Sequence, residues 1–293
     1  MCGICGFYKI KSNKYISPDY IRDMCNIMRH RGPDGEGVWI DDTNVCGLGH
    51  RRLSIIDLSD KAAQPMSNGA KDVIVSFNGE IYNYQEIKDE LLEKYMWKTD
   101  HSDTEVLLHA YEEWGIECIN RFRGMFSIAI FDKKLNKLWL VRDRVGIKPL
   151  YYYYNNGIFT FASEIKALLK VIEKVPLINK KSFFDYFSFS TSMGQKTMFE
   201  NIYKVEPATI MGIEVGKEIC FKRYWDVLDN INDDIKKLSE KEISDILLEE
   251  FKESVRMRTC SDVPVGTFLS GGIDSSFVTL LMPKLKRKIT KNQ

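Results

Sequence analysis

The sequence lacks any apolar run near the roughly 20 residues that a membrane-spanning helix requires, and no basic segment precedes an apolar one at its amino terminus. It also lacks an excess of charge of either sign, because 42 Lys and Arg balance 41 Asp and Glu to a net +1. No global field therefore attracts nucleic acid or an anionic membrane. These absences predict a cytoplasmic protein that acts on small molecules, with neither nucleic acid nor membrane as a partner.

Histidine is scarce, and the cysteines show little pairing. The seven cysteines are odd in number and scattered, which favours reduced thiols over a disulfide framework. Cys2 and Cys5 form a C-x-x-C pair, but the sequence has no second pair, and its four histidines lack metal-site spacing. A redox or zinc role for the pair is thus the weaker interpretation, and we expect no metal site here.

The composition is that of a folded protein. A hydrophobic content of 44%, with 12% aromatic and 28% charged residues, predicts a packed core. A length of 293 residues suits one full domain followed by part of a second. We expect domain one at 2–218, a linker at 219–237 and an incomplete domain at 238–293.

The apolar pattern predicts many short strands in the first domain. They are expected at about 4–10, 73–77, 125–131, 138–141, 150–154 and 158–161, with further strand-like pattern from 209 to 225. Ser17-Pro18 predicts a helix start, and Ser102 with Glu105 predicts a capping box. Many strands with interspersed helices indicate an α+β fold.

The carboxyl-terminal part follows a different pattern. Residues 226–237 are polar and charged, which is typical of a linker. Ser239 and Glu242 predict a second capping box and a helix. A strand over 265–269, a glycine turn and a helix from about Asp274 would form the opening of a nucleotide-binding unit.

Cys2 is the first candidate for chemistry. If Met1 is removed, which its small neighbour permits, Cys2 carries both a thiol and a free α-amine. An amine with a pKa of about 8 can act as the general base for the thiol, so no separate histidine is needed. Taken alone, Cys2 is better explained as an inert terminal residue.

Several further motifs follow Cys2-Gly3-Ile4. In their residues and their order along the chain, the sequence resembles the class II glutamine amidotransferases, and among these the asparagine synthetase family. The motifs are Arg29 to Gly35, His50 to Asp57, Asn78 to Asn83, Ser102 to Glu105, Arg142 to Arg144 and Pro149 to Tyr152. The resemblance implies an N-terminal-nucleophile fold, a four-layer αββα sandwich with two antiparallel sheets between helical layers. The opening fragment of an α/β ATP-pyrophosphatase domain is expected to follow.

The resemblance also implies a glutamine site. The Asn78 amide and the Gly79 N–H would form the oxyanion hole for attack by Cys2. The glutamine-binding set implied is Arg52, Leu53, Ser54, Ile55, Ile56, Asn78, Gly79, Glu80 and Asp103. Within it, a guanidinium suits the α-carboxylate and acidic groups suit the α-ammonium.

Each of these residues also has a structural explanation. Asn78-Gly79 is a strong turn signal, and a turn would itself present the two donors. Arg52 alone would be a surface charge. Asp103 would complement a helix dipole with or without a ligand.

A second constellation lies between the expected strand and helix of the carboxyl-terminal part. The residues implied to bind ATP, with Mg²⁺, are Leu269, Ser270, Gly271, Gly272, Asp274, Ser275 and Ser276. Glycines clear a path for phosphates, and a helix start favours anions. No Lys-Ser or Lys-Thr follows, so the loop is not the Walker type, and in isolation it could equally be a flexible turn.

Together the motifs imply glutamine-dependent asparagine synthesis. ATP would activate aspartate as an acyl-adenylate, and ammonia released at Cys2 would attack it. The family continues for a further domain, so we expect this chain to retain the glutaminase half, as a homodimer or with a separate synthetase chain. Another class II amidotransferase, for an amino sugar or a purine precursor, and a non-catalytic glutamine sensor are the alternative functions.

Overall fold

The computed structural model describes residues 1–285 and divides into two compact units. The first unit comprises Met1–Ser54 and Ser59–Asp226, and the second comprises Ile55–Leu58 and the chain from Val227. The division at 226/227 falls inside the expected linker 219–237. Residues 220–223 of that linker form a strand of the first unit, because their backbone pairs with Thr209–Gly212.

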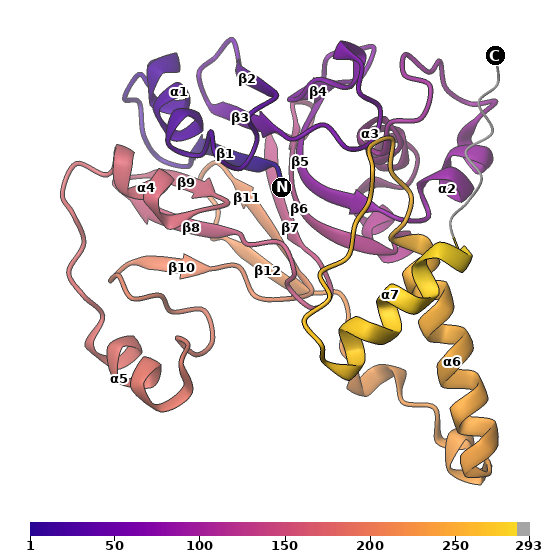
Figure 1. Cartoon of the computed structure of the whole chain (residues 1–293). Coiled ribbons are helices and arrows are strands. Elements are labelled where there is room, and N and C mark those ends of the chain that lie inside the picture. Colours follow the sequence, from indigo (N-terminus) through magenta and orange to yellow (C-terminus); the bar gives the residue numbers. More distant parts are fainter. Residues whose placement is uncertain (286–293) are drawn as a thin grey trace. The chain divides into compact units, whose positions relative to one another are not determined.

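Two six-stranded antiparallel sheets form the middle of the first unit (Figure 1). The first sheet has the order β10 (Ile202–Lys204), β8 (Tyr151–Asn155), β9 (Ile158–Ala162), β1 (Gly3–Lys9), β3 (Cys46–Arg52), β2 (Gly35–Ile40). The second has the order β12 (Cys220–Arg223), β11 (Thr209–Glu214), β7 (Lys137–Arg142), β6 (Gly124–Asp132), β5 (Val73–Ile81), β4 (Met66–Ser67). All the expected first-domain strands are present, while β2, β3, β4 and β10 were not predicted.

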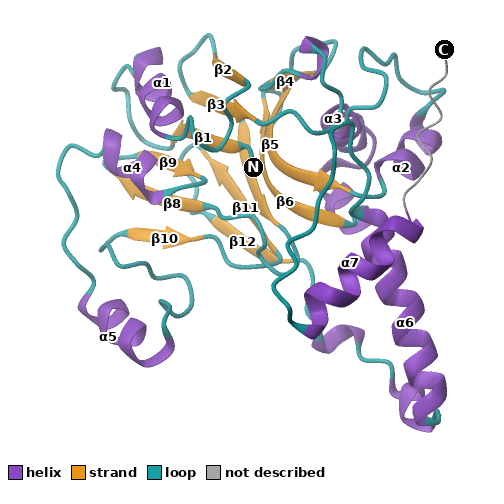
Figure 2. Ribbon diagram, in the orientation of Figure 1, coloured by secondary structure: helices purple, strands orange, loops and turns teal. Residues whose placement is uncertain are grey.

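Helices cover the outer faces of both sheets (Figure 2). Helices α1 (Pro18–Ile27) and α4 (Ile165–Val171) pack on the first sheet, and α2 (Tyr84–Leu91) and α3 (Asp103–Trp114) lie at the second. The predicted four-layer αββα sandwich is therefore confirmed.

The two-residue period of β1 decides which side chains face which layer. Ile4 and Tyr8 lie in the core between the sheets, whereas Cys5 and Phe7 pack in the core under α1 and α4. The same alternation turns Cys2 toward the space between the sheets. Cys5 faces the opposite way, which separates the two thiols of the C-x-x-C pair.

Of the two helix caps predicted in the first unit, one is present in the structure. Ser17 caps α1 as predicted, since its hydroxyl accepts a hydrogen bond from the Asp19 N–H at 3.2 Å. The predicted capping box at Ser102 is wrong, because the Ser102 side chain makes no capping bond. The carboxylate of Glu105 is buried and accepts instead from the N–H groups of Lys98 and Thr99, both at 2.8 Å.

The remaining elements of the first unit are short. Two 3₁₀ helices cover Asp60–Ala62 and Gly115–Arg121. Helix α5 (Lys180–Phe189) lies between β9 and β10, and the Asn179 side chain caps it by accepting from the Ser182 N–H at 3.1 Å. These segments connect the layers and contribute no residue to the candidate site.

The second unit consists of helices. After 3₁₀ turns at Leu228–Asn230 and Asp233–Lys237 come α6 (Glu240–Met257) and α7 (Ile273–Leu285). The predicted capping box of Ser239 and Glu242 is confirmed. A small core joins the helices, with the rings of Phe251 and Phe277 4.9 Å apart.

The strand predicted over 265–269 is wrong, since these residues have no regular structure. A lone strand leaves its N–H and C=O groups without ladder partners, and the described residues of the second unit contain no strand to pair with it. The final residues of the predicted synthetase segment, 286–293, lie outside the described residues.

Candidate functional site

The candidate nucleophile lies at the start of β1, on the inner face of the sandwich. The Cys2 sulfur accepts a hydrogen bond from the Leu53 N–H at 3.3 Å and lies 3.6 Å from the Leu53 carbonyl. Because Gly3 pairs with Arg51, Cys2 adjoins Arg52 at the end of β3. The Cys2 carbonyl also accepts from Arg31 Nε at 2.8 Å. Backbone contacts therefore fix the position of the thiol.

The surroundings of Cys2 keep the thiol protonated in the absence of a base. Burial is the main cause that raises the pKa of the Cys2 thiol, and the nearby Asp103 adds to this, whereas the Leu53 hydrogen bond and the charge of Lys148 act in the opposite direction. Burial lowers the pKa of the Met1 amine, the terminal amine while Met1 is retained.

Asn78 and Gly79 lie on the neighbouring sheet within β5. They are paired with Ser127 and Phe126 of β6, so the turn that the Asn-Gly pair indicated is wrong. Asn78 is fully buried; its Nδ2 donates to Ser127 Oγ at 3.4 Å, and its Oδ1 has no partner among the described residues. An amide so little engaged keeps hydrogen-bonding capacity for a ligand.

Gly79 is required by close packing. A Cβ atom at this position would lie 2.2 Å from the Met125 carbonyl oxygen and 2.7 Å from the Phe126 Cα. Both neighbours are backbone atoms of β6, so neither can move away cheaply. The glycine thus permits the backbone approach between β5 and β6 that holds Asn78 in position.

Asp103 is the first residue of α3, and its carboxylate accepts from the Ile81 N–H at 3.2 Å. Burial raises the pKa of Asp103 to about 7, and the charge of Glu80 at the end of β5 contributes. A helix dipole acting alone would lower this pKa, so the dipole does not explain the residue. Together the buried Asp103 and the half-buried Glu80 favour a cationic partner.

The four residues predicted as the wall of the glutamine pocket belong to different units: Leu53 and Ser54 to the first, Ile55 and Ile56 to the second. Arg52 is half-buried and donates to the Ser59 carbonyl at 2.8 Å, and the Ser54 N–H donates to Asp34 Oδ2 at 2.9 Å. Leu53 contacts the thiol as described above. Ile55 and Ile56 belong to the second unit, where the Ile55 carbonyl accepts from the Asp262 N–H at 2.9 Å.

His50 is a site neighbour that the sequence reasoning did not single out. It is buried on the inner face of β3, with Nε2 3.0 Å from the Phe77 carbonyl, directly before Asn78. Burial lowers the pKa of His50 to about 4, so the imidazole is neutral at physiological pH. The only sequence feature that could have identified His50 as a site residue was its place in the motif from His50 to Asp57. His50 joins the two sheets beside the candidate oxyanion hole.

The loop after β7 contains the end of the motif Arg142 to Arg144, for which the sequence predicted no role. Asp143 is buried and accepts from the N–H groups of Phe126, Val145, Ile147 and Lys148 at 2.9–3.3 Å. These bonds fold the loop tightly and direct Lys148 into the protein, where it is 5% exposed.

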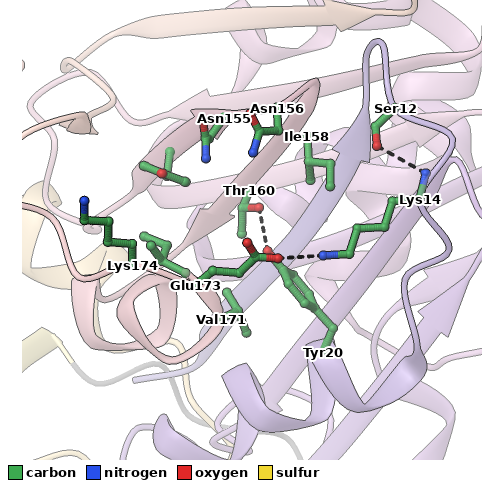
Figure 3. Close-up of a pocket in the computed structure, with 12 residues that line it drawn as sticks. Ser12, Lys14, Tyr20, Asn155, Asn156, Ile158, Thr160, Val171, Glu173 and Lys174 are labelled. Carbon is green, nitrogen blue, oxygen red and sulfur yellow. Dashed lines mark hydrogen bonds and ion pairs between the residues drawn. The ribbon is translucent and has the colours of Figure 1, made fainter.

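A cavity of about 340 Å³ lies elsewhere on the first unit (Figure 3). Its lining includes Ile158, which pairs with Lys9 at the end of β1 remote from Cys2. Tyr20 and Thr160 hydrogen-bond across it at 2.9 Å, and Lys14 pairs with Glu173 at 2.7 Å. These polar groups satisfy one another, and the cavity is separate from the candidate site.

Comparison with known proteins supports the same interpretation. Residues 1–225 match the model of the glutamine amidotransferase domain family. This chain belongs to that family. The amidotransferase also matches the asparagine synthase family over residues 247–291. The class II amidotransferase assignment, with a short asparagine synthase segment, is therefore confirmed.

The curated relatives of the amidotransferase include asparagine synthetases. Asparagine synthetase 1 of Bacillus subtilis is 39% identical over 95% of this chain and 43% of its own length. Asparagine synthetase B of Escherichia coli is 31% identical over 100% of this chain and 47% of its own length. The chain thus spans about half the length of these two relatives.

Solved structures support the fold. The glutamine phosphoribosylpyrophosphate amidotransferase of Bacillus subtilis superposes with a TM-score of 0.57 at 17% identity, covering 76% of this chain and 49% of that one. At this identity the likeness shows a shared fold and carries no information on the acceptor of the ammonia.

The loop predicted to bind ATP is exposed in the amidotransferase. Gly271 has φ +84° with open space around its Cα, and α7 begins two residues later. Ser270 and Ser275 hydrogen-bond each other at 3.0 Å. Within the described residues no sheet supports the loop, and ATP binding by these residues stays a prediction.

Two other expectations concern metals and membranes. Among the residues described, no group of three or more His, Cys, Asp or Glu side chains is arranged to hold a metal ion. Across residues 1–285, no helix combines the length and apolar character needed to cross a bilayer. The seven cysteines are all free thiols, and the sulfurs of Cys5 and Cys25 lie 3.6 Å apart.

Proposed function

We propose that this amidotransferase hydrolyses glutamine to glutamate and ammonia, with Cys2 as the nucleophile. The observation that carries the proposal is the joining of β3, whose following residue Leu53 holds the Cys2 sulfur, to β5, which carries Asn78. His50 Nε2 lies 3.0 Å from the Phe77 carbonyl and Ser76 Oγ donates to the Gly49 carbonyl at 3.1 Å, and the charge of Asp103 acts on the pKa of the thiol. A nucleophile, an amide donor and an acidic group are the parts that hydrolysis of an amino-acid side-chain amide requires.

The chemistry begins with removal of Met1, which frees the α-amine of Cys2. This amine accepts the thiol proton, and the thiolate attacks the carboxamide carbon of glutamine. Asn78 Nδ2 and the Gly79 N–H donate to the oxyanion. Collapse of the intermediate returns the proton to the leaving nitrogen and releases ammonia, and water then hydrolyses the thioester to glutamate.

Substrate recognition uses both ends of the free amino acid. Asp103 and Glu80 bind the α-ammonium, and a cation there restores the ionised form of a carboxyl whose pKa burial raises to about 7. The guanidinium of Arg52 binds the α-carboxylate. Leu53, Ser54, Ile55 and Ile56 complete the proposed glutamine pocket.

The ammonia, we propose, serves the synthesis of asparagine from aspartate in the whole protein. The printed names of the relatives and the asparagine synthase match at residues 247–291 support this use. ATP with Mg²⁺ would activate the aspartate. The partner we propose is a second copy of this chain or a separate synthetase chain, and we place the reaction in the cytoplasm.

The synthase match favours this function over amination of an amino-sugar or purine precursor. A non-catalytic glutamine sensor is the remaining alternative, and retention of Met1 would favour it. Mass spectrometry of the purified chain distinguishes the enzyme from the sensor. For the enzyme we expect the mass of a chain that begins at Cys2, whereas the mass of a chain that keeps Met1 would favour the sensor.

Ammonia release from glutamine tests the central proposal. The wild-type chain should release ammonia and glutamate in equal amounts, and Cys2→Ala should abolish both. Cys5→Ala is the matched control, since this thiol faces the opposite layer, and it should retain activity. Equal slow release by the wild type and Cys2→Ala would show that Cys2 is not the nucleophile.

A further inference from the structure

Asp57 ends the motif that begins at His50, and no step of the proposed chemistry uses it. It is buried, although the next residue, Leu58, is exposed. Its φ of 51° lies in the left-handed region, which a residue other than glycine seldom adopts unless neighbouring contacts hold it there. Asp57 therefore marks a point at which the loop after β3 is held in one shape.

One set of contacts that holds this shape comes from a residue 205 positions further along the chain. The Asp57 N–H donates to Asp262 Oδ2 at 2.7 Å, and the Asp262 N–H donates to the Ile55 carbonyl at 2.9 Å. All three residues belong to the second unit. Two short hydrogen bonds that run in opposite directions fix both the position and the orientation of the backbone from Ile55 to Asp57.

The residues around Asp262 hold its backbone in place. The Ser261 hydroxyl donates to the Val263 carbonyl at 3.0 Å, and the Val263 N–H donates to the Ser261 oxygen at 3.2 Å. Val265 then packs against the core of α6 and α7. Asp262 itself is exposed, so its carboxylate can be removed without opening a cavity in that core.

The loop that Asp262 holds begins at the candidate nucleophile. The Leu53 N–H donates to the Cys2 sulfur at 3.3 Å. The guanidinium of Arg52 donates to the Ser59 carbonyl at 2.8 Å, which joins the two ends of the loop at its base. The loop therefore connects the residue that holds the thiol to the residues that bond to Asp262.

We propose that Asp262 is a positioning residue that sets the affinity for glutamine, because it holds Ile55 to Asp57 in the shape that receives the substrate. The inference rests on the proposed function, in which Ile55 and Ile56 line the glutamine pocket. A segment that is already ordered loses less conformational entropy when a ligand binds, so the ligand binds more tightly. Asp262 has no part in the chemical step, so its loss should weaken binding and leave kcat unchanged.

Calorimetric titration of glutamine into the Cys2→Ala chain measures binding without turnover. Adding Asp262→Ala should raise Kd by about tenfold, because the buried Asp57 N–H loses its acceptor and the loop loosens. Asp262→Asn keeps an oxygen for this N–H and should hold Kd within about twofold of the parent. Asp245→Ala, at an exposed position of α6, is the matched control and should leave Kd unchanged. In the chain that keeps Cys2, Asp262→Ala should raise KM by the same factor with kcat unchanged.

Hydrogen exchange of the peptide over residues 53–59, followed by mass spectrometry, tests the anchor without glutamine. Asp262→Ala should speed exchange in this peptide by about tenfold and leave the strands of the first unit unchanged. If Asp262→Ala fails to fold, Asp262→Ser makes the same test, because its shorter side chain does not reach the Asp57 N–H.

The outcomes separate this inference from the proposed function. A Kd that Asp262→Ala leaves unchanged would overturn the inference, and so would exchange over residues 53–59 that it leaves unchanged. If the wild type releases no ammonia while the Cys2→Ala chain binds glutamine, the proposed hydrolysis fails, and the Kd of the Asp262 variants still decides the inference. Absence of both ammonia release and glutamine binding would overturn both.

Discussion

Asn78 tests the proposed chemistry at the scale of a single residue, because its amide is buried and its Nδ2 donates one long hydrogen bond, to Ser127 Oγ at 3.4 Å. Asn78→Ala should lower kcat for glutamine hydrolysis by about 10²–10³-fold and change KM little, since the oxyanion forms in the transition state. Steady-state kinetics measure both constants. Asn155→Ala, at an exposed hairpin, is the control and should behave as the wild type. A KM effect without a kcat effect would place Asn78 in substrate binding alone.

Asp103 should show opposite effects on binding and stability. Asp103→Asn keeps an acceptor for the Ile81 N–H but loses the charge for the α-ammonium, so KM for glutamine should rise at least about tenfold. The same substitution should increase the free energy of unfolding at high pH. The pKa of Asp103 is raised to about 7 from an ordinary value near 4, so the folded chain binds the extra proton between these values.

The free energy of unfolding should therefore fall in the wild type as pH rises from about 4 to 7. Asp103→Asn, which has no proton to lose, should be the more stable protein at pH 8, by up to about 4 kcal/mol, with the advantage lost below pH 4. Urea unfolding at pH 4, 6 and 8 measures this difference. A difference that does not vary with pH would mean that Asp103 titrates normally.

At the scale of an element, Glu105 decides how α3 is joined to the segment before it. Burial by itself would raise the pKa of Glu105, but His109, whose Nε2 lies 3.7 Å from Oε1, and hydrogen bonds from Thr99 and Lys98 outweigh it and lower the pKa to about 2. One carboxylate oxygen accepts from the Lys98 N–H and the other accepts from the Thr99 N–H and hydroxyl. This anchor fixes the loop just before Asp103.

Glu105→Gln should destabilise the protein by about 2–3 kcal/mol, because one oxygen becomes an NH₂ group that faces donors. The loss should be full above pH 4.5 and should shrink as pH falls toward 2, where the wild-type carboxylate takes up its proton. Urea unfolding measures it. Glu113→Gln, which changes a surface ion pair with Lys94, should leave the free energy of unfolding essentially unchanged. Equal effects of the two variants would contradict the anchor.

At the scale of the whole molecule, the two units differ in what stabilises them. The two sandwich cores of the first unit lie within residues 4–213, while the second unit has a small core of α6 and α7 side chains. Burial of apolar area is the main stabilising term in folding, so the first unit should fold without the second.

A chain ending at Asp226 should keep its main thermal transition and its glutaminase kcat within about twofold. Calorimetry and ammonia release measure the two quantities. Phe251→Ala in the full chain is the matched comparison, because it weakens the core of α6 and α7 without shortening the chain, and it should leave both quantities unchanged. Loss of the glutaminase activity on truncation would show that residues after Asp226 contribute to the site.

The sequence alone determined the elements whose signals are local. Alternating apolar residues fixed β1, β5, β6, β7, β8 and β9, and Ser17 and Ser239 fixed two helix starts, because side-chain period and capping act over a few residues. The motifs further predicted the αββα sandwich through a family resemblance. The identity of the candidate nucleophile also came from the sequence.

Tertiary structure decided what depends on contacts distant in sequence. Strand β3 is rich in glycine and went unpredicted; a Cβ at Gly49 would lie 2.4 Å from Ile21, so α1 requires the glycine that weakens the strand signal. Asn78-Gly79 forms strand instead of turn because β6 pairs with it. Burial of Asp103 and Lys148 likewise follows from the packing of separate elements, and local sequence carries no record of that packing.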